Sequence, residues 1–425
     1  MDTWSRRFAD ERIYAFEKLS DSQQDFLITL LNERFPPSVY ETHRRKRQQA
    51  QRNLLQARQS LAGASQQFPV CIESSNVLLQ PDSLGGYGIV LTAGGEGERL
   101  RLSLQAKGFP AEALLDFTKA TFPLPGFFED FGSLQVNLTL IAEISARFQV
   151  DLPVVVTTGP AGSATARAIA AAIARHAAFG IKHIKVICQG ERLHLTLNEQ
   201  IAYEIKDGLP YPVTNPDETG GPLMKLKALE NGAGQSTLDW LAACGAEKIM
   251  VMQGTAVYHP DLIPLMAEAA RHYDGLGVGI LRGRFDPGDP FGSFVVLKTA
   301  AKAQLVILEQ EVCNSQTYAL MDRSRQYFLP YNTGFYVFAR EVLQNNDLPD
   351  YATPPKEVLA KLPRSPKVGY AATDILALAR KPAVLAVRPD HYGVIKNADD
   401  LESLAEMAKR FGLDELCRRA THRSM

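Results

Sequence analysis

The spacing of apolar residues changes near residue 85. Before that point, apolar residues recur at helical intervals over 12–34, and 41–67 is rich in Arg, Gln, Ala and Leu, so both segments predict helices. After it, short apolar runs alternate with longer amphipathic segments, which is typical of strands and helices in turn. The predicted strands are 88–93, 152–158, 183–189 and 248–253, and the predicted helices are 133–148, 162–179, 222–231 and 260–272.

This alternation predicts an α/β, Rossmann-like fold: a mixed, mainly parallel sheet with helices on both faces. The segment 276–311 contains shorter β segments, which we expect to pair antiparallel at the edge of the site. A last strand at 383–388 precedes a C-terminal helix that begins at 397–400. We therefore expect an N-terminal helical region (1–75), a central α/β domain (76–385) and a small C-terminal region (386–425).

Charge and cysteine content narrow the class of protein. The 46 basic and 47 acidic side chains nearly cancel, so no overall field attracts nucleic acid or an anionic membrane. Five widely separated cysteines without a Cys-x-x-Cys pair favour a reducing compartment over a zinc site or a disulfide framework. No apolar stretch reaches the about 18 residues of a membrane span, so we expect a cytoplasmic protein. The basic run Arg44-Arg45-Lys46-Arg47 predicts a solvated helix face.

A glycine-rich turn, Gly94-Gly95-Glu96-Gly97-Glu98-Arg99-Leu100, follows the first predicted strand of the sheet. Glycine lets an anion approach backbone N–H groups closely, and Arg99 can add a bidentate contact to phosphate oxygens. The turn has Leu100 where the dinucleotide fingerprint needs its third glycine, and it lacks the Gly-Lys-Ser/Thr end of a P-loop. It therefore predicts a polyphosphate cradle of neither type, although an ordinary loop with an exposed arginine has the same composition.

Lys119 opens an apolar turn that ends at Pro123. Together with the glycine turn it resembles nucleotidyltransferases that make sugar nucleotides, in which Gly-Gly-x-Gly-x-Arg-Leu is followed by Lys-x-x-x-Pro. Attack of a sugar phosphate on the α-phosphorus of a nucleoside triphosphate builds charge on phosphate oxygens, which backbone amides, arginine, lysine and a divalent metal stabilise. Lys107 is the competing lysine, but Gly108-Phe109-Pro110 follows it in place of that turn.

Five later segments resemble one subgroup, the UTP-dependent sugar-1-phosphate uridylyltransferases, which include the UDP-N-acetylglucosamine, UDP-glucose and UDP-sugar pyrophosphorylases. The segments begin at Gln189, Pro216, Leu308, Asn332 and Val394, and their order and rough spacing match the family from about residue 85 to 400. The resemblance implies the nucleotide-diphospho-sugar transferase-like fold, with 76–385 as the nucleotidyltransferase domain. An amide side chain such as that of Gln189 can match both the donor and the acceptor on the edge of uracil.

The resemblance also implies a reaction and a set of site residues. UTP and a sugar 1-phosphate would give a UDP-sugar and pyrophosphate, with Mg²⁺ as the cofactor. By position in the family's motifs, Gly94, Gly95 and Gly97 hold the UTP phosphates, Gln189, Gly220 and Gly221 the uracil, and Glu309 and Asn332 the sugar, while Arg99, Lys119 and Lys396 are the catalytic contacts to phosphate.

One departure from the family affects the expected metal site most. Gln253 stands where the family has a metal-binding aspartate, and a neutral amide binds a hard dication more weakly than a carboxylate does. Asp217 and Asp261 are alternative ligands by proximity in sequence only, so the metal ligands are left open. Because of this departure, we consider an alternative function: a catalytically altered or inactive protein that binds a nucleotide or sugar phosphate on the same fold.

Overall fold

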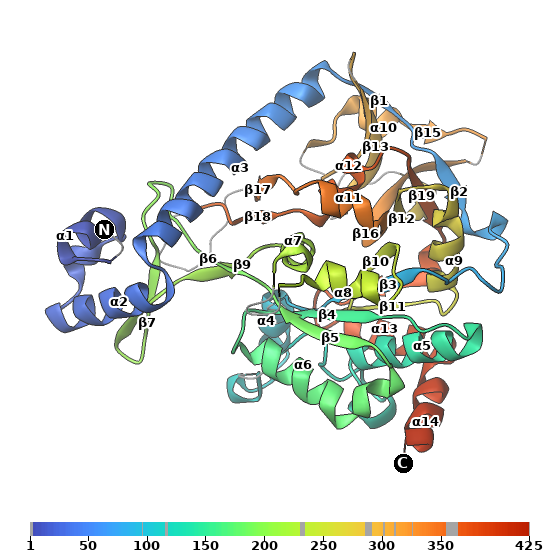
Figure 1. Cartoon of the computed structure of the whole chain (residues 1–425), viewed down its shortest axis with the longest axis horizontal. Coiled ribbons are helices and arrows are strands. Elements are labelled where there is room, and N and C mark those ends of the chain that lie inside the picture. Colours follow the sequence, from blue (N-terminus) through green and yellow to red (C-terminus); the bar gives the residue numbers. More distant parts are fainter. Residues whose placement is uncertain are drawn as a thin grey trace. The chain divides into compact units, whose positions relative to one another are not determined.

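The computed structural model describes residues 3–95, 97–114, 118–229, 234–284, 291–300, 302–309, 312–324, 326–353 and 364–424. Backbone contacts divide the chain (Figure 1) into two compact units, each assembled from three separate segments. Unit 1 contains Met1–Ala62, Gly190–Gly221 and Leu348–Ala372, and unit 2 contains Gly63–Gln189, Pro222–Asp347 and Thr373–Met425. The predicted regions 1–75, 76–385 and 386–425 divide the chain by sequence alone, and their boundaries stay a prediction.

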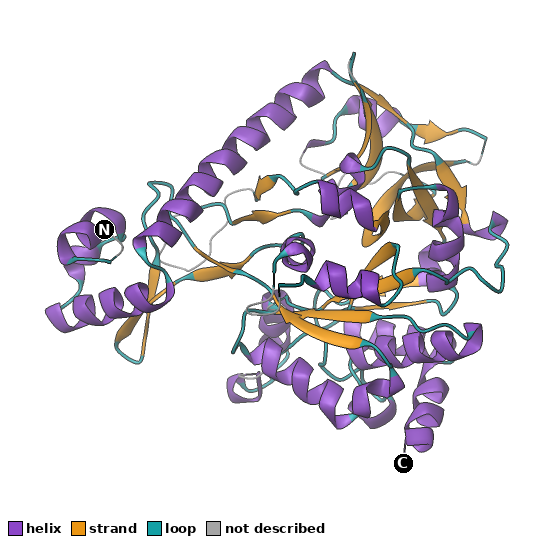
Figure 2. Cartoon of the chain, in the orientation of Figure 1, coloured by secondary structure: helices purple, strands orange, loops and turns teal. Residues whose placement is uncertain are grey.

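Unit 1 consists of helices and short pairs of strands (Figure 2). Its helices are α1 (Arg6–Arg12), α2 (Asp21–Arg34) and most of α3 (Pro37–Gly63), and its antiparallel pairs are β6 (Glu191–Leu193) with β9 (Thr214–Pro216), β7 (Tyr203–Lys206) with β8 (Leu209–Pro212), and β17 (Asp350–Ala352) with β18 (Val368–Tyr370). The prediction of one helical segment over 12–34 was wrong in detail, because α1 ends at Arg12 and Ser20 starts α2 with a capping box to Gln23.

The basic run on α3 is not uniformly solvated. Arg45 is exposed, but the side chain of Arg47 is buried, with 1 % of its surface accessible. The prediction of a solvated helix face was therefore wrong for Arg47. A helix turns about 100° per residue, so one member of a short polar run can point into the core while its neighbours face water.

Unit 2 is built around a sheet with the strand order β2–β19–β12–β16–β10–β3–β4–β5. Strands β3 (Tyr87–Thr92), β4 (Val154–Thr158), β5 (Ile184–Cys188) and β10 (Lys248–Gln253) confirm the four predicted strands, and they pair parallel to one another. Strand β16 (Tyr327–Ala339) runs antiparallel between β10 and β12 (Gly275–Arg282), which pairs parallel with β19 (Pro382–Val387), itself parallel to β2 (Cys71–Glu73). The sheet is thus mixed and mainly parallel, as predicted.

Helices cover both faces of this sheet (Figure 1). Ile89 and Leu91 of β3 pack in one core cluster with residues of α5 (Ser133–Phe148), whereas a Cβ atom at Gly88 would meet Leu241 of α8 (Thr237–Ala243) at 2.9 Å. Successive strand residues point to opposite faces, so α5 and α8 lie on opposite sides of β3. The remaining helices are α4 (Glu98–Ala106), α6 (Ala164–Arg175), α7 (Gly221–Lys227), α9 (Leu262–Ala269), α10 (Ser315–Ala319), α11 (Arg340–Asn345), α12 (Ile375–Leu378), α13 (Asp400–Arg410) and α14 (Leu413–Ser424).

Several predicted helices are shorter in the structure. The predicted helix 162–179 is α6 alone, because the Ser163 hydroxyl caps its start and left-handed backbone at Ala178 and Phe179 follows its end. The predicted helix 260–272 contains α9 and a short 3₁₀ turn.

The β segments of 276–311 are β12, β13 (Ser293–Lys298) and β14 (Ala303–Leu308). β13 and β14 pair antiparallel as predicted, and β12 does so with β16. Over the described part of the chain, no helix combines the length and apolarity that crossing a membrane requires.

Candidate active site

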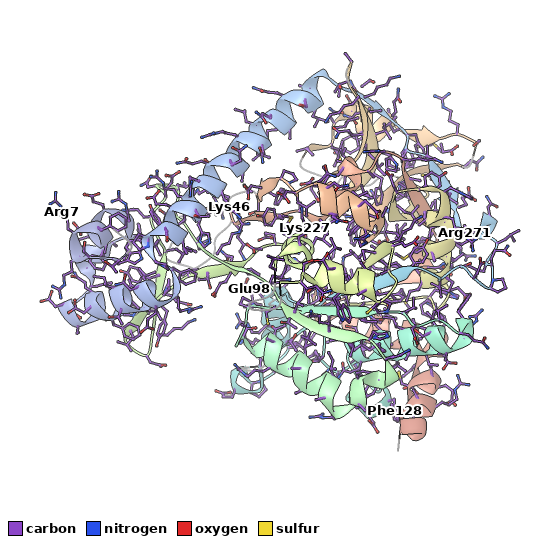
Figure 3. All side chains as sticks on the ribbon, in the orientation of Figure 1. Arg7, Lys46, Glu98, Phe128, Lys227 and Arg271 are labelled. Atoms are coloured by element: carbon purple, nitrogen blue, oxygen red, sulfur yellow. The ribbon has the colours of Figure 1, made fainter. Side chains whose placement is uncertain are left out.

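The predicted phosphate cradle lies at the carboxyl end of β3, where α4 begins. Gly97 has φ 65° and ψ 22°, left-handed backbone that favours glycine, and Glu98 (labelled in Figure 3) is the first residue of the nine-residue helix α4. A Cβ atom at Gly95 would meet nothing within 4 Å, so the backbone there borders open space. Arg99 is exposed in the first turn of α4. The turn therefore offers backbone N–H groups, a helix N-terminus and a guanidinium to an anion. Glu96 lies outside the described residues.

Gly94 and Gln189 are in direct contact. A Cβ atom at the buried Gly94 would lie 2.5 Å from Gln189 Nε2 and 2.6 Å from the carbonyl oxygen of Thr158, so only glycine fits. The Gln189 backbone N–H donates to that same carbonyl at 3.1 Å. Since β3, β4 and β5 are adjacent and parallel, their carboxyl ends bring these two predicted nucleotide contacts together at one edge of the sheet.

Lys119, Arg99 and Lys396 form a cluster of cations in unit 2. Burial, together with the positive charges of Lys396 and Arg99, lowers the pKa of Lys119 to about 8, and the Asp400 carboxylate opposes this shift. Asp400 Oδ2 also accepts the backbone N–H groups of Lys396 at 2.7 Å and Asn397 at 2.8 Å. The three predicted phosphate contacts, drawn from three distant parts of the sequence, are therefore close enough to influence one another.

The loop that carries Lys396 is fixed to α4. The backbone N–H of Ala398 donates to the Ser103 hydroxyl at 2.8 Å, and the ammonium of Lys396 lies 3.4 Å from the centroid of the Phe291 ring. Lys107, the competing lysine, is half exposed and forms an ion pair with Asp399 at 2.6 Å. Lys107 is thus neutralised by a carboxylate, whereas Lys119 lies in a partly buried, positively charged environment.

The predicted sugar contacts Glu309 and Asn332 meet at Gly292. The Asn332 backbone N–H donates to the Gly292 carbonyl at 2.8 Å, and a Cβ atom at Gly292 would lie 3.3 Å from Glu309 Cδ. Asn332 Oδ1 accepts from the Tyr336 hydroxyl at 3.1 Å and from the backbone N–H of Gly334 at 2.9 Å.

Asp374 belongs to the same neighbourhood, and the sequence prediction missed it. Burial raises the pKa of its carboxyl to about 6. Burial also raises the pKa of the Tyr336 hydroxyl, which the charges of Glu309 and Asp374 raise further and the hydrogen bond to Asn332 lowers. The available signal was an aspartate directly before the apolar run Ile-Leu-Ala-Leu of α12, a pattern that by itself also fits an ordinary helix start.

Gln253 ends β10 and is used as a hydrogen-bond donor. Its Nε2 donates to the Thr333 carbonyl at 2.7 Å, and the same carbonyl accepts from the Tyr392 hydroxyl at 2.9 Å. Gly334 has φ 78°, and a side chain there would collide with the amide of Gln253. Gln253 therefore holds the turn at Thr333 and Gly334 against the strand end.

The donor set around Gln253 does not fit a magnesium ion held by the protein. Within the described residues, no group of three or more His, Cys, Asp or Glu side chains could hold a metal. The two alternative ligands pair with cations: Asp217 with Arg192, and Asp261 with Arg147 at 3.3 Å. A neutral amide oxygen is a weak ligand for this hard dication. Mg²⁺ stays a prediction from the sequence.

The glycines of the predicted uracil loop are tightly packed within unit 1. A Cβ atom at Gly220 would lie 2.8 Å from the backbone of Tyr370, and one at Gly221 would collide with Asp217. The Gly220 N–H donates to the Tyr370 carbonyl at 2.7 Å. Packing alone thus requires glycine at both positions. Gln189 belongs to unit 2 and the two glycines to unit 1, so a uracil site formed by all three stays a prediction.

Arg192 anchors this loop and is a second residue that sequence reasoning did not assign. Its buried guanidinium pairs with Asp217 and lies 3.5 Å from Asp350, and its Cζ lies 4.6 Å from the centroid of the Tyr370 ring. Two acids and an aromatic ring therefore balance the arginine. The signal was an arginine inside the Gln189–Leu193 motif, which looks like a surface residue without its distant partners.

The chain is similar to known proteins in structure. No family model matches the chain, and no curated protein matches it by sequence. It is similar to the UDP-N-acetylglucosamine pyrophosphorylase from Trypanosoma brucei in complex with inhibitor, with TM-score 0.66 and 14 % identity over 96 % of this chain and 82 % of that one. It is also similar to a UDP-glucose phosphorylase from Trypanosoma brucei, with TM-score 0.58 and 13 % identity over 81 % of this chain and 70 % of that one. A mutant UDP-glucose pyrophosphorylase from Leishmania major in complex with UDP-glucose is similar with TM-score 0.55 and 13 % identity over 80 % of this chain and 70 % of that one. These likenesses confirm the predicted fold, and with it the resemblance at the level of fold.

Proposed function

We propose that this chain is a nucleotidyltransferase that joins UTP and a sugar 1-phosphate to give a UDP-sugar and pyrophosphate. The observation that supports it most is the cation cluster of Arg99, Lys119 and Lys396 beside a glycine turn that opens a helix. Burial and the charges of Lys396 and Arg99 disfavour the charged form of Lys119, and the phosphates of a nucleoside triphosphate would supply the negative charge that compensates it. The fold likeness to pyrophosphorylases of nucleotide sugars agrees with this chemistry.

In the proposed reaction, a phosphate oxygen of the sugar 1-phosphate attacks the α-phosphorus of UTP and the bond to pyrophosphate breaks. The attacking phosphate is already an anion, so the step requires no general base. Charge develops on the α-phosphate oxygens and on the leaving pyrophosphate, and Arg99, Lys119 and Lys396 stabilise it electrostatically. The backbone of Gly94, Gly95 and Gly97 orients the phosphates.

On the sugar side, we propose that Asn332 and Glu309 contact hydroxyl groups of the sugar. The side-chain oxygen of Asn332 accepts from Tyr336 and Gly334, which orients the amide so that its nitrogen is the group that would donate to a sugar hydroxyl. Asp374 supplies a second carboxylate near Tyr336.

The catalytically altered binding protein is the second candidate, and the hydrogen bond from Gln253 to Thr333 favours it, because the position of the family's metal ligand has a structural use here. Release of pyrophosphate from UTP or ATP with a panel of sugar 1-phosphates separates the two functions. We expect turnover with UTP, and losses of about 10²-fold or more in kcat for Arg99→Ala and Lys119→Ala. Lys107→Ala is the matched control and should stay near wild type, since its partner Asp399 neutralises it. Binding of UTP without turnover on any sugar phosphate would establish the second candidate.

A further inference from the structure

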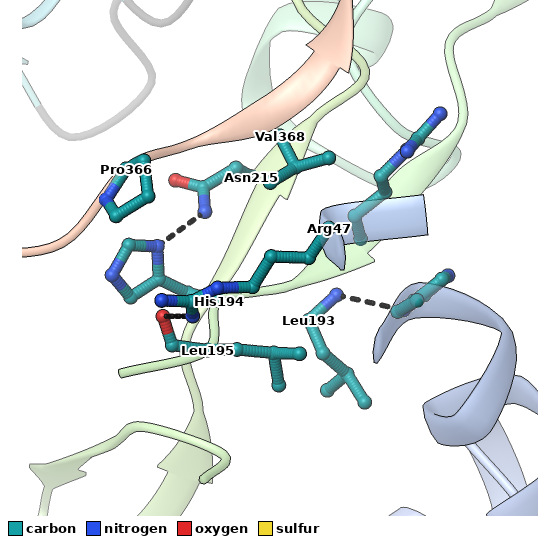
Figure 4. Close-up of a pocket in the computed structure, with 9 residues that line it drawn as sticks. Arg47, Leu193, His194, Leu195, Asn215, Pro366 and Val368 are labelled. Carbon is teal, nitrogen blue, oxygen red and sulfur yellow. Dashed lines mark hydrogen bonds between the residues drawn. The ribbon is translucent and has the colours of Figure 1, made fainter. Parts of the chain in front are cut away.

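Unit 1 contains a small cavity between α3 and the strands β6, β9 and β18, shown in Figure 4. Its volume is about 10 Å³, the size of one water-sized body. Among its lining residues are Arg47, His43, His194 and Arg192, and none of the described residues that line it is a carboxylate. The cavity therefore combines a small volume with a strongly basic wall.

Arg47 is the residue whose charge is not balanced. Its side chain is 1 % exposed, and its Nη1 donates to the carbonyl oxygens of Leu195 and Thr196. Its Nε and Nη2 are buried and have no hydrogen-bond partner in the described part of the chain. A buried cation needs both hydrogen-bond acceptors and a counter-charge, and two neutral carbonyls supply only part of the first requirement.

Glu199 is the acid that acts on Arg47, and it is engaged by other groups. Its two carboxylate oxygens accept from Gln48 Nε2 at 2.9 and 3.2 Å, and one of them lies 3.8 Å from Arg44. Burial lowers the pKa of Arg47, which the charge of Glu199 offsets only in part. Within the described ranges, Arg47 thus has no ion pair with a carboxylate of its own.

Two other basic groups of the cavity, Arg192 and His194, interact with neighbouring residues. Arg192 is paired with Asp217 and Asp350. His194 is neutral, because burial and the nearby charges of Lys367 and Arg47 lower its pKa to about 4, and its two ring nitrogens bond to Asn215 at 2.9 Å and Ser365 at 2.6 Å.

His43 is also neutral, since burial lowers its pKa to about 4. Its Nδ1 accepts the backbone N–H of Leu193 at 3.2 Å, so its proton is on Nε2, which can donate. Within the described residues, the wall therefore presents the two unpartnered N–H groups of Arg47 beside a positive charge that has no carboxylate of its own.

We propose that this cavity binds a single compact monovalent anion of the halide class, with Arg47 Nε and Nη2 as its main contacts. A water molecule would satisfy the two N–H groups but would leave the charge unbalanced. The volume excludes a nucleotide, a sugar phosphate or pyrophosphate, so the site is separate from the proposed chemistry. A bound anion would tie α3 to the strand region of Leu195 and Thr196 and stabilise unit 1.

The experiment measures the melting temperature of the full chain in sodium chloride and in sodium gluconate at equal ionic strength. Because an anion that binds only the folded state raises stability by mass action, we expect the melting temperature to rise with the logarithm of chloride concentration above its rise in gluconate. Arg47→Met should abolish the difference. Arg45→Met removes the same charge from an exposed position of the same helix and should retain it. Equal melting in both salts, or a chloride response that survives Arg47→Met, would overturn the proposal.

A direct measurement covers the case in which Arg47→Met does not fold. Crystals of the wild-type chain grown in sodium bromide should show an anomalous peak within hydrogen-bond distance of Arg47 Nε or Nη2. A cavity without such a peak would overturn the proposal independently of any variant.

Discussion

Replacement of Lys119 by methionine should stabilise the protein while it removes activity. In the folded protein without ligand, burial and the charges of Lys396 and Arg99 lower the pKa of Lys119 from 10.5 to about 8. One pKa unit corresponds to about 1.4 kcal/mol, so the charged ammonium costs the folded state about 3 kcal/mol. Methionine keeps the length and the apolar stem of lysine without the charge, so most of this cost should be recovered.

The sign of the pH dependence follows from the same values. Between about pH 8 and pH 10.5, Lys119 has lost its proton in the folded state but retains it in the unfolded state, so the wild type gains stability as the pH rises through this window. Lys119→Met has no such group. Its advantage over the wild type should therefore be full at pH 7 and shrink progressively above pH 8.

Urea unfolding at pH 7 and at pH 9.5 measures both effects. Lys107→Met is the control, because Lys107 is exposed, its hydrogen bond to Asp399 raises its pKa, and its removal should not stabilise the protein. If Lys119→Met is less stable than the wild type at pH 7, or if the difference between them is the same at both pH values, the positive environment of Lys119 deduced from the structure is wrong.

Two further substitutions test other parts of the site. Asp374→Asn should raise the free energy of unfolding at pH 7 by about 2–3 kcal/mol, because burial raises the pKa of this carboxyl from 3.8 to about 6 and the wild type loses stability as the pH rises through that window. Urea unfolding at pH 4 and pH 7 measures this effect, and an equal difference between variant and wild type at the two pH values would contradict it. Gln253→Glu should lower the free energy of unfolding by about 1–3 kcal/mol, because a carboxylate cannot donate to the Thr333 carbonyl. Gln253→Met removes the donor but adds no opposing charge, so it should lower the free energy of unfolding by less. An unchanged free energy of unfolding in Gln253→Glu would show that the hydrogen bond is unimportant.

The sheet could be predicted because its signal is local. Strands β3, β4 and β10 are short apolar runs buried on both faces, and β5 at the end of the strand order is a partly buried run of the same kind. Helix α5 follows its amphipathic pattern from end to end. The helix ends were less predictable. The Ser163 hydroxyl caps the start of α6, and left-handed backbone follows the end of this helix. The spacing of apolar residues does not indicate where such a change of backbone conformation occurs.

The partners of charged residues could not be predicted, since they are distant in sequence. Arg192 meets Asp217 and Asp350, and Arg47 meets carbonyls about 150 residues further along the chain. From the sequence alone, Arg47 was predicted to lie on a solvated helix face, and Arg192 was given no role. The predicted sites at Lys119 and Lys396 are different, because the resemblance to a family supplied their proximity in advance, and the structure brings the two lysines together.

The electrostatics of the charged groups separate structural from functional residues. Arg192 and Lys107 each have a carboxylate partner, so each ionised side chain is already compensated. Lys119 and Asp374 are charges of opposite sign in the same unit, yet the pKa of each is shifted against its ionised form by burial. A folded protein retains such unfavourable charges where a ligand compensates them, because the same charges then contribute more to binding than prepaired ones would. In the proposed function, Lys119 contacts a phosphate, and Asp374, which acts on the Tyr336 hydroxyl that donates to Asn332, contacts a polar group of the sugar, so one ligand would compensate both charges. A protein that bound the nucleotide alone would leave the Asp374 carboxylate uncompensated, so we expect a sugar phosphate to bind in either candidate function, and release of pyrophosphate is the measurement that separates the two.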